Sequence, residues 1–86
     1  MAIKINVVDV PWYEVESSNV RRLRWVPVDV TPRCVYGTLT VEYSWGGTYE
    51  YYRVSSQRFG RLLAAESVGS YINSRLKPNY IATEVT

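Results

Sequence analysis

The sequence predicts an α+β fold, in which an antiparallel β-meander of three to four strands carries one or two short C-terminal helices packed on one face. Apolar and polar side chains alternate from Leu39 to Tyr43, as in a strand with one buried face, and Gly46-Gly47 then predicts a turn into a partner strand from Thr48 to Val54. After Val54 the apolar spacing lengthens from two residues to about 3.6, which is typical of helices. We expect residues 1–86 to form a single domain, because 86 residues are enough for one domain and too few for two.

The N-terminal part of the chain predicts a strand followed by a turn. Ile3 to Val10 alternate partly, so we expect a strand here that Pro11 ends or confines to a sheet edge. The segment Ser17-Ser18-Asn19 favours a turn, because its side chains bond readily to nearby backbone groups.

A second strand is expected from Val20 to Val26. Val20 and Leu23 are an odd number of residues apart, so in a regular strand they would lie on opposite faces. Val20 can share the face of Leu23 only through a bulge. Pro27 and Pro32 then bracket a predicted loop that ends near Cys34.

The register of the later hairpin decides which face its tyrosines occupy. A two-residue turn at Gly46-Gly47 would pair Tyr43 with Glu50, and the tyrosines on either side of that glutamate would then lie on the face opposite Leu39.

A three-residue turn of Trp45-Gly46-Gly47, with a glycine in the left-handed conformation, would instead pair Tyr43 with Tyr49 and Val41 with Tyr51. We favour this second register because it makes one continuous aromatic face.

The C-terminal half predicts two helices and a tail. Ser55 or Ser56 can cap the first helix, and Ser67 can cap a second helix that Pro78 ends. The tail from Tyr80 to Thr86 either adds an edge strand or frays. The apolar positions are Phe59, Leu62 and Leu63 in the first helix, and Val68, Tyr71, Ile72 and Leu76 in the second.

The composition argues against catalysis. The chain has no histidine, so the commonest general acid–base and the commonest metal ligand are both missing. Cys34 is the only cysteine, which rules out an internal disulfide and a thiol metal cluster. The acidic residues are scattered, and no glycine-rich phosphate loop is present. We therefore expect a non-enzymatic protein that uses neither a metal nor a cofactor.

The sequence also predicts a cytoplasmic protein. No apolar run approaches the roughly 20 residues that span a bilayer. The N-terminus lacks the basic start and the apolar stretch of a secretory signal.

Four short motifs occur in one order along the chain: Ser17-Ser18-Asn19-Val20, Leu39-Thr40-Val41-Glu42-Tyr43, Tyr49-Glu50-Tyr51 and Ser67-Val68-Gly69-Ser70-Tyr71-Ile72-Asn73. Together they resemble the KTSC domain family, named for its occurrence at the C-terminus of some lysyl-tRNA synthetases. The resemblance covers about residues 13–80 and leaves the expected strand at 3–10 outside the family core. The stretch from Val26 to Gly37 is longer than the tight turn typical of the family.

The resemblance implies a stand-alone small protein of bacteria or their phages, since the family occurs in that form. RNA binding has been proposed for the family from its synthetase context. A bacterial cytoplasmic location, with a phage-encoded origin as one option, is the corresponding expectation.

The C-terminal half is locally basic, although the whole chain carries a net charge of only +2. Between residues 53 and 77 the only acid is Glu66. Cations in this arrangement can neutralise phosphates, and the alternative interpretation is an ordinary solvated surface. The candidate nucleic-acid-binding cations are Arg53, Arg58, Arg61, Arg75 and Lys77.

Aromatic side chains are the other binding candidates. Tyr49 and Tyr51 can stack nucleobases if they are exposed on the sheet, and they belong to the core if they face the helices. Trp45, at the predicted hairpin tip, and Trp12 are candidate anchors for a protein partner.

The remaining motif residues have a structural interpretation. We expect Ser18, Asn19 and Asn73 to tie turns and helix ends to the sheet, Gly69 to permit close packing, and Tyr71 to face the core. The alternative is that Ser18, Asn19 and Asn73 contact a ligand directly.

The leading hypothesis is a binding module for RNA or single-stranded nucleic acid. The second is a protein-interaction module, such as a phage accessory factor that docks on or inhibits a host protein. A third is a small-molecule or nucleotide sequestering protein. The sequence leaves the oligomeric state open.

Overall fold

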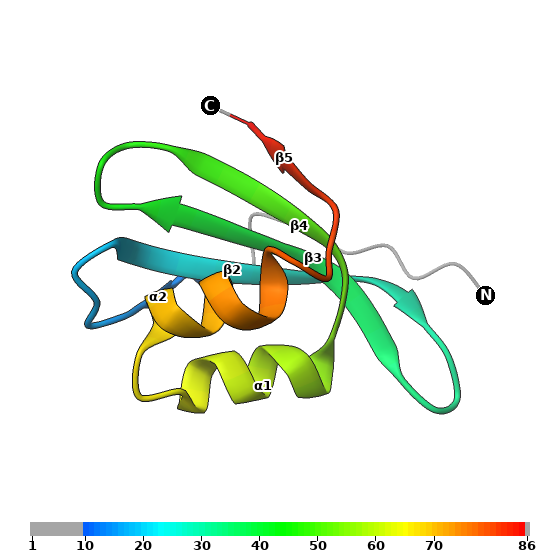
Figure 1. Ribbon diagram of the computed structural model, residues 1–86. Helices are drawn as coiled ribbons and strands as arrows, with labels where there is room; N and C mark the ends of the chain where they lie inside the picture. The colour runs from blue at the N-terminus through cyan, green and yellow to red at the C-terminus, as the bar shows by residue number, and fades with distance from the viewer. Residues whose placement is uncertain (1–9, 86) are drawn as a thin grey trace.

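A computed structural model describes residues 10–85, which form a five-stranded antiparallel sheet with helices on one face (Figure 1). The sheet order equals the chain order. The strands are β1 (Tyr13–Glu14), β2 (Val20–Val30), β3 (Val35–Tyr43), β4 (Thr48–Ser55) and β5 (Ala82–Glu84). The helical segments are α1 (Ser56–Ala64), α2 (Val68–Tyr71) and the π-helical η2 (Ile72–Leu76), which continues α2 directly.

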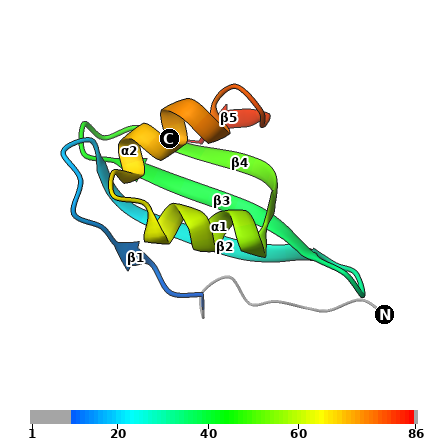
Figure 2. The same cartoon turned by 60° about the horizontal axis from the view of Figure 1, so that its bottom comes forward.

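The predicted α+β class and meander are confirmed, and the strand number is five rather than three to four. The extra strands are short edge segments: β1 pairs with β2 through two residues, and the C-terminal tail pairs with β4 as β5. Figure 2 shows α1 and α2 on the same side of the sheet, with β1 and β5 at its opposite edges. The expected strand from Ile3 to Val10 lies, apart from its last residue, outside the described residues.

Strand β2 begins with the predicted bulge and then runs further than expected. The register shifts between Val20 and Arg22, and this shift brings Val20 into the core beside Leu23. The predicted loop starting at Pro27 is wrong, because β2 continues through Pro27, which pairs with Gly37. Strand β1 pairs with only two residues of β2, so within residues 10–85 the outer edge of β2 is open at Pro27, where a missing N–H costs little.

The β3–β4 hairpin has a register that differs from both expectations. Val41 pairs with Tyr49 and Leu39 pairs with Tyr51, so the turn residues are Ser44, Trp45 and Gly46. Gly46 takes the left-handed conformation, with φ 105°. The turn is therefore a three-residue turn, as favoured, but it begins one residue earlier than predicted.

This shift leaves the predicted faces unchanged. The pairing differs by two residues from the favoured register, and side chains alternate with a period of two, so Tyr49 and Tyr51 still share the face of Leu39. That face is the one covered by the helices. Tyr51 belongs to the buried core, and Tyr49 packs against it.

Strand β4 contains a second irregularity, near its C-terminal end. The register between β3 and β4 shifts between the Leu39–Tyr51 pair and the Gly37–Val54 pair. Within the bulged segment Arg53 adopts a left-handed conformation with φ 56°, which is rare for a residue with a side chain. Val54 consequently returns to the buried face.

Both predicted helix caps are present. The Ser55 hydroxyl accepts a hydrogen bond from the Arg58 backbone N–H at 3.0 Å, and the Ser67 hydroxyl accepts one from Ser70 at 3.2 Å. Phe59 faces the core as expected. Leu63 does not, because it is 37% exposed on the outer side of α1.

One contact joins the sheet to α1 at the far end from the β3–β4 turn. Trp25 stacks on Phe59 with ring centroids 5.8 Å apart, and its indole N–H donates to the Val54 carbonyl at 2.9 Å. The indole lies directly over Gly37. A Cβ atom at residue 37 would lie 2.7 Å from the indole and would also overlap the Val26 carbonyl oxygen. The indole and the Val26 carbonyl oxygen therefore leave no room for a side chain at residue 37.

We predict that Gly37→Ala destabilises the protein by about 1–3 kcal/mol, because backbone and a stacked indole must both move. For a domain of this size the midpoint of thermal unfolding should fall by roughly 4–8 °C per kcal/mol. Gly60→Ala is the matched control, since a Cβ at residue 60 of α1 meets nothing within 4 Å. It should raise stability by about 0.5–1 kcal/mol through helix propensity. Equal melting temperatures for both variants would contradict the packing of Trp25 over Gly37.

Candidate functional site

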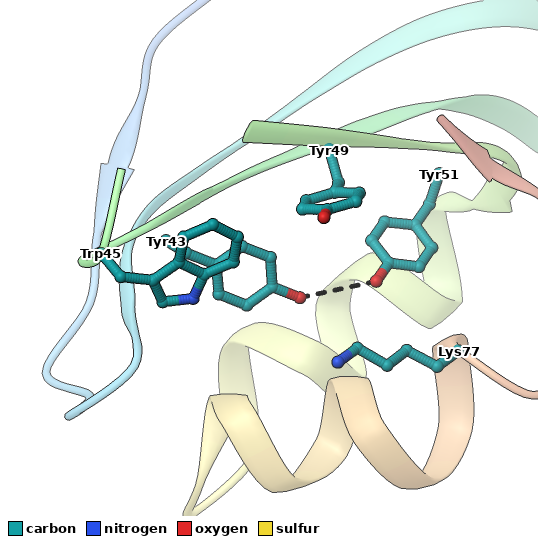
Figure 3. Close-up of a pocket in the computed structure, with 5 residues that line it drawn as sticks. All are labelled: Tyr43, Trp45, Tyr49, Tyr51 and Lys77. Carbon is teal, nitrogen blue, oxygen red and sulfur yellow. Dashed lines mark hydrogen bonds between the residues drawn. The ribbon is translucent and has the colours of Figure 1, made fainter. Parts of the chain in front are cut away.

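The candidate site is an aromatic pocket at the end of the sheet where the β3–β4 turn meets the C-terminal end of η2 (Figure 3). Its cavity has a volume of about 170 Å³. This is below the roughly 300–1,000 Å³ of pockets that enclose drug-sized ligands, so the space suits one ring-sized group. Its walls are Tyr43, Trp45, Tyr49, Tyr51 and Lys77.

Strand alternation brings the three tyrosines together. Tyr43 ends β3, and Tyr49 and Tyr51 lie on β4 on the same face. The hydroxyl oxygens of Tyr43 and Tyr51 are 3.5 Å apart, and the Tyr43 ring meets the Tyr49 ring edge-on at 5.7 Å. Tyr51 is only 2% exposed, so it forms the inner wall of the pocket and does not offer a free face for stacking.

Trp45 lies on the outer side of the pocket and is both exposed and fixed. Its indole is 64% exposed, yet it stacks on Tyr43 at 5.4 Å and contacts Tyr49 edge-on at 6.3 Å. Gly47 makes room for it, because a Cβ at residue 47 would overlap the six-membered ring of the indole. The turn thus presents a large aromatic surface to solvent in one orientation.

Lys77 supplies the charge. It follows η2, where its backbone N–H donates to the Ile72 carbonyl at 2.9 Å, and Leu76 beside it is fully buried. Its ammonium group lies 5.9 Å from the centroid of the Tyr43 ring. No carboxylate within residues 10–85 forms an ion pair with it. The lysine is therefore available to an anion at the mouth of the pocket.

A second, smaller compartment adjoins the first and shares Tyr43, Trp45 and Lys77 with it. Its volume is about 130 Å³, and its other walls are Asn19, Gly69 and Asn73. The turn before β2 and the helix α2 come close here: a Cβ at Gly69 would lie 3.8 Å from the Asn19 side-chain nitrogen, an ordinary contact. The close approach therefore does not require a glycine at residue 69, contrary to the expectation from the sequence.

The hydrogen bonds that hold this turn come from Ser17, which belongs to the predicted turn segment, and from Ser44. Ser17 accepts from the backbone N–H groups of Asn19 and Val20, both at 3.3 Å, and Ser44 donates to the carbonyls of Ser18 and Asn19. Sequence reasoning missed Ser44.

The amide side chains of Asn19 and Asn73 make no hydrogen bond with another described residue. Both residues are exposed and line the compartment, so their side chains do not tie the turn or the helix end to the sheet as predicted.

The predicted basic residues are not gathered in one patch. Arg58 of α1 donates a hydrogen bond to the Tyr71 hydroxyl of α2 at 3.1 Å. Arg61 lies one helical turn after Arg58, and Arg75 lies one helical turn after Tyr71. The pKa of Arg58 is raised, chiefly by hydrogen bonding to Tyr71 and then to Tyr80, so the guanidinium stays charged. We call Arg58, Arg61 and Arg75 the helical basic group.

Arg53 lies apart from this group. It is 3.8 Å from the Asp29 carboxylate and lies over the Tyr36 ring at 4.7 Å, so its charge is partly matched within the protein.

Trp12 is held on the opposite face of the sheet. The guanidinium groups of Arg22 and Arg24 lie over its ring at 4.1 and 4.4 Å, and Arg22 also pairs with Glu42 at 2.8 Å. Because both cations cover the indole, Trp12 is less available as an anchor than Trp45.

The structure thus places an exposed indole, three tyrosines and one lysine around a single pocket. Within the described residues no three His, Cys, Asp or Glu side chains gather in a way that could hold a metal ion. Residues 10–85 also form no helix that is long and apolar enough to cross a membrane.

Comparison with known proteins identifies the family. A model of the KTSC domain matches residues 35–80. The chain belongs to the KTSC domain family. The match includes seven of the eight residues that line the two compartments, and Asn19 alone lies before it.

A protein of Tsukamurella paurometabola, described simply as "Protein", is 35% identical over 68 residues, which cover 79% of this chain and 91% of that protein. The motifs that carry the resemblance to KTSC domains thus converge on one pocket in this KTSC chain.

The pocket has one pH-dependent group whose behaviour can be measured. Burial raises the pKa of Tyr43 well above its ordinary value of 10.0, and the hydrogen bond and charge of Tyr51 and the charge of Tyr49 add to the effect. Above about pH 10 the unfolded chain releases this proton while the folded chain keeps it, so the free energy of unfolding should fall as the pH rises.

We predict that Tyr43→Phe makes the free energy of unfolding fall less steeply with pH in the alkaline range. The change in slope is up to one proton, or about 1.4 kcal/mol per pH unit. Denaturant unfolding from about pH 8 to about pH 11 measures the slope. Tyr13→Phe, at an exposed ring, is the matched control and should keep the wild-type slope. An unchanged slope in Tyr43→Phe would contradict the assigned burial of the hydroxyl.

Proposed function

We propose that this KTSC domain is a non-enzymatic binding module for single-stranded nucleic acid, with RNA as the preferred ligand. The observation that carries the proposal is Trp45, an exposed indole held in one orientation beside the free ammonium group of Lys77. A nucleotide combines a planar ring with an anionic phosphate, and this pair of side chains is complementary to both parts.

Trp45 takes the stacking role that the sequence assigned to Tyr49 and Tyr51. Tyr51 is buried and Tyr49 is half-buried, and both face the helices. Their contribution in this proposal is to shape the pocket and to orient the indole through Tyr43. Stacking of one base on an aromatic side chain contributes about 1–3 kcal/mol in single-strand binding proteins.

The helical basic group supports the proposal from a neighbouring surface. Its three arginines form no ion pair with any carboxylate in residues 10–85, and Glu66 is the only acid between residues 53 and 77. Cations without internal partners are free to contact phosphates and to release the counterions condensed around them. A strand with one base on Trp45 would need to run past η2 to reach this group.

A protein partner is the second candidate, and two observations favour it. Trp45 is the kind of exposed aromatic side chain that anchors interfaces, and the β2–β3 arm carries Val28 and Val30 at 71% and 50% exposure. Binding through these apolar groups would depend little on salt, which separates it from phosphate binding.

We predict that labelled single-stranded RNA binds in fluorescence polarisation at low salt and that its affinity falls as salt is added. The Arg61→Ala, Arg75→Ala double variant should bind more weakly and should lower the slope of log K against log salt by about 1.4, since each phosphate contact on a single strand contributes about 0.7. These two exposed arginines are preferable to Arg58, whose removal would also break its bond to Tyr71.

Arg33→Ala is the matched control, because this exposed arginine lies in the turn between β2 and β3, away from the helices. It should leave the salt slope unchanged. Absence of binding even at low salt would overturn the nucleic-acid proposal and favour a protein partner.

We also predict that Trp45→Ala and Gly47→Ala weaken RNA binding by a similar factor, about tenfold. The first variant removes the stacking surface, which accounts for roughly 1–3 kcal/mol. The second displaces the indole, because the new methyl group would overlap it. The double variant should bind no more weakly than either single variant, which a double-mutant cycle tests directly. Additive losses would show that the indole does not need the Gly47 space in order to bind.

A further inference from the structure

The two compartments around Trp45 contain more hydrogen-bonding groups than stacking alone requires. Asn19 and Asn73 approach the smaller compartment from different elements, the turn before β2 and the helix η2, and Lys77 borders both compartments. Their side chains have no hydrogen-bond or ion-pair partner elsewhere in the described part of the chain. We propose that this site selects an unpaired purine base, an inference that rests on the proposed nucleic-acid function.

The size of the site limits it to one base. The compartments measure about 170 and 130 Å³ and share three walls, so they form one small site with two lobes. Neither lobe approaches the volume of a pocket for a drug-sized ligand. The tyrosine wall closes the inner side, where Tyr43 and Tyr51 join through their hydroxyls. A single base on Trp45 would therefore present one edge to the smaller compartment.

The chemistry of the free groups matches the Hoogsteen edge of a purine. An asparagine amide carries both a donor and an acceptor and can pair with N6 and N7 of adenine. A lysine ammonium group carries donors only and can pair with O6 and N7 of guanine. Both pairings use N7, which pyrimidines lack. The arrangement therefore favours either purine over cytosine and uracil.

The backbones of the two asparagines are held in place without the ligand. The backbone of Asn19 is fixed by Ser17 and Ser44, and its side chain takes no part in those bonds. Asn73 lies between the buried residues Ile72 and Leu76 along η2, which hold that turn against the sheet. Because neither amide supports the fold, both can be removed without unfolding the domain.

The test uses short uridine oligonucleotides with and without one central adenosine or guanosine, titrated against the full chain by fluorescence polarisation. We expect a single purine to tighten binding about tenfold, in line with one good base-edge interaction. The Asn19→Ala, Asn73→Ala double variant should bind the adenosine oligonucleotide with the affinity of the uridine control, because the amides are the groups that pair with adenine. Asn79→Ala is the matched control, since its amide bonds to the Arg75 carbonyl outside the pocket, and it should retain the preference.

A second probe separates hydrogen bonding from stacking. An oligonucleotide with 7-deazaadenosine at the central position keeps the purine ring but replaces N7 with a C–H group. It should bind as weakly as the uridine control. A preference for adenosine that survives this change, or that survives the double asparagine variant, would overturn the inference and leave stacking on Trp45 as its cause.

Two further outcomes distinguish this inference from the function beneath it. Salt-dependent binding with equal affinity for all bases would overturn the purine selection and leave the nucleic-acid proposal standing. No binding to any of the oligonucleotides at low salt would overturn both.

Discussion

The left-handed turn at Gly46 determines where the aromatic side chains of this protein lie. The turn pairs β3 with β4 so that Tyr43, Tyr49 and Tyr51 all face the helices. A register shifted by one residue would send the tyrosines of β4 to the other face, because side chains alternate along a strand. The pocket depends on this parity, since three of its five walls come from this hairpin face. The same turn holds Trp45, so one short segment sets both the shape of the site and its exposed surface.

The helices complete the site by a different kind of constraint. The α2–η2 segment is anchored through Val68, Ile72 and Leu76, which belong to the buried core. Two polar residues, Asn73 and Lys77, directly follow the anchors Ile72 and Leu76 in the chain. They line the compartment at the hairpin end of the sheet. On another side of the segment, Tyr71 accepts a hydrogen bond from Arg58 of α1. The helix layer therefore divides the positive charge between a pocket cation and a separate surface, which composition alone could not show.

Much of the fold was predictable from the sequence because its signals are local. The caps at Ser55 and Ser67, the bulge at Val20 and the alternation of β3 each depend on neighbouring residues. The error at Pro27 came from an interaction distant in the chain, because an open sheet edge lets β2 continue through this residue. The tail was predicted either to add an edge strand or to fray, and it forms β5 because β4 offers it a partner. The site followed the same rule. Tyr49, Tyr51, Trp45 and Lys77 were named from the sequence, but their meeting in one pocket with Asn19 and Asn73 depends on tertiary packing.

The bulge at Arg53 makes chain length critical at one point of the fold. The extra residue turns β4 by half a period, so Val54 returns to the face of Tyr51 and α1 starts on that side of the sheet. Arg53 holds a backbone conformation that costs a residue with a side chain roughly 1–2 kcal/mol. A relative lacking one residue here would direct its helices toward the other face and could not assemble the pocket. Length variation among KTSC domains should therefore concentrate in the β2–β3 arm, where the chain already departs from the compact core, and spare the four residues from Tyr51 to Val54.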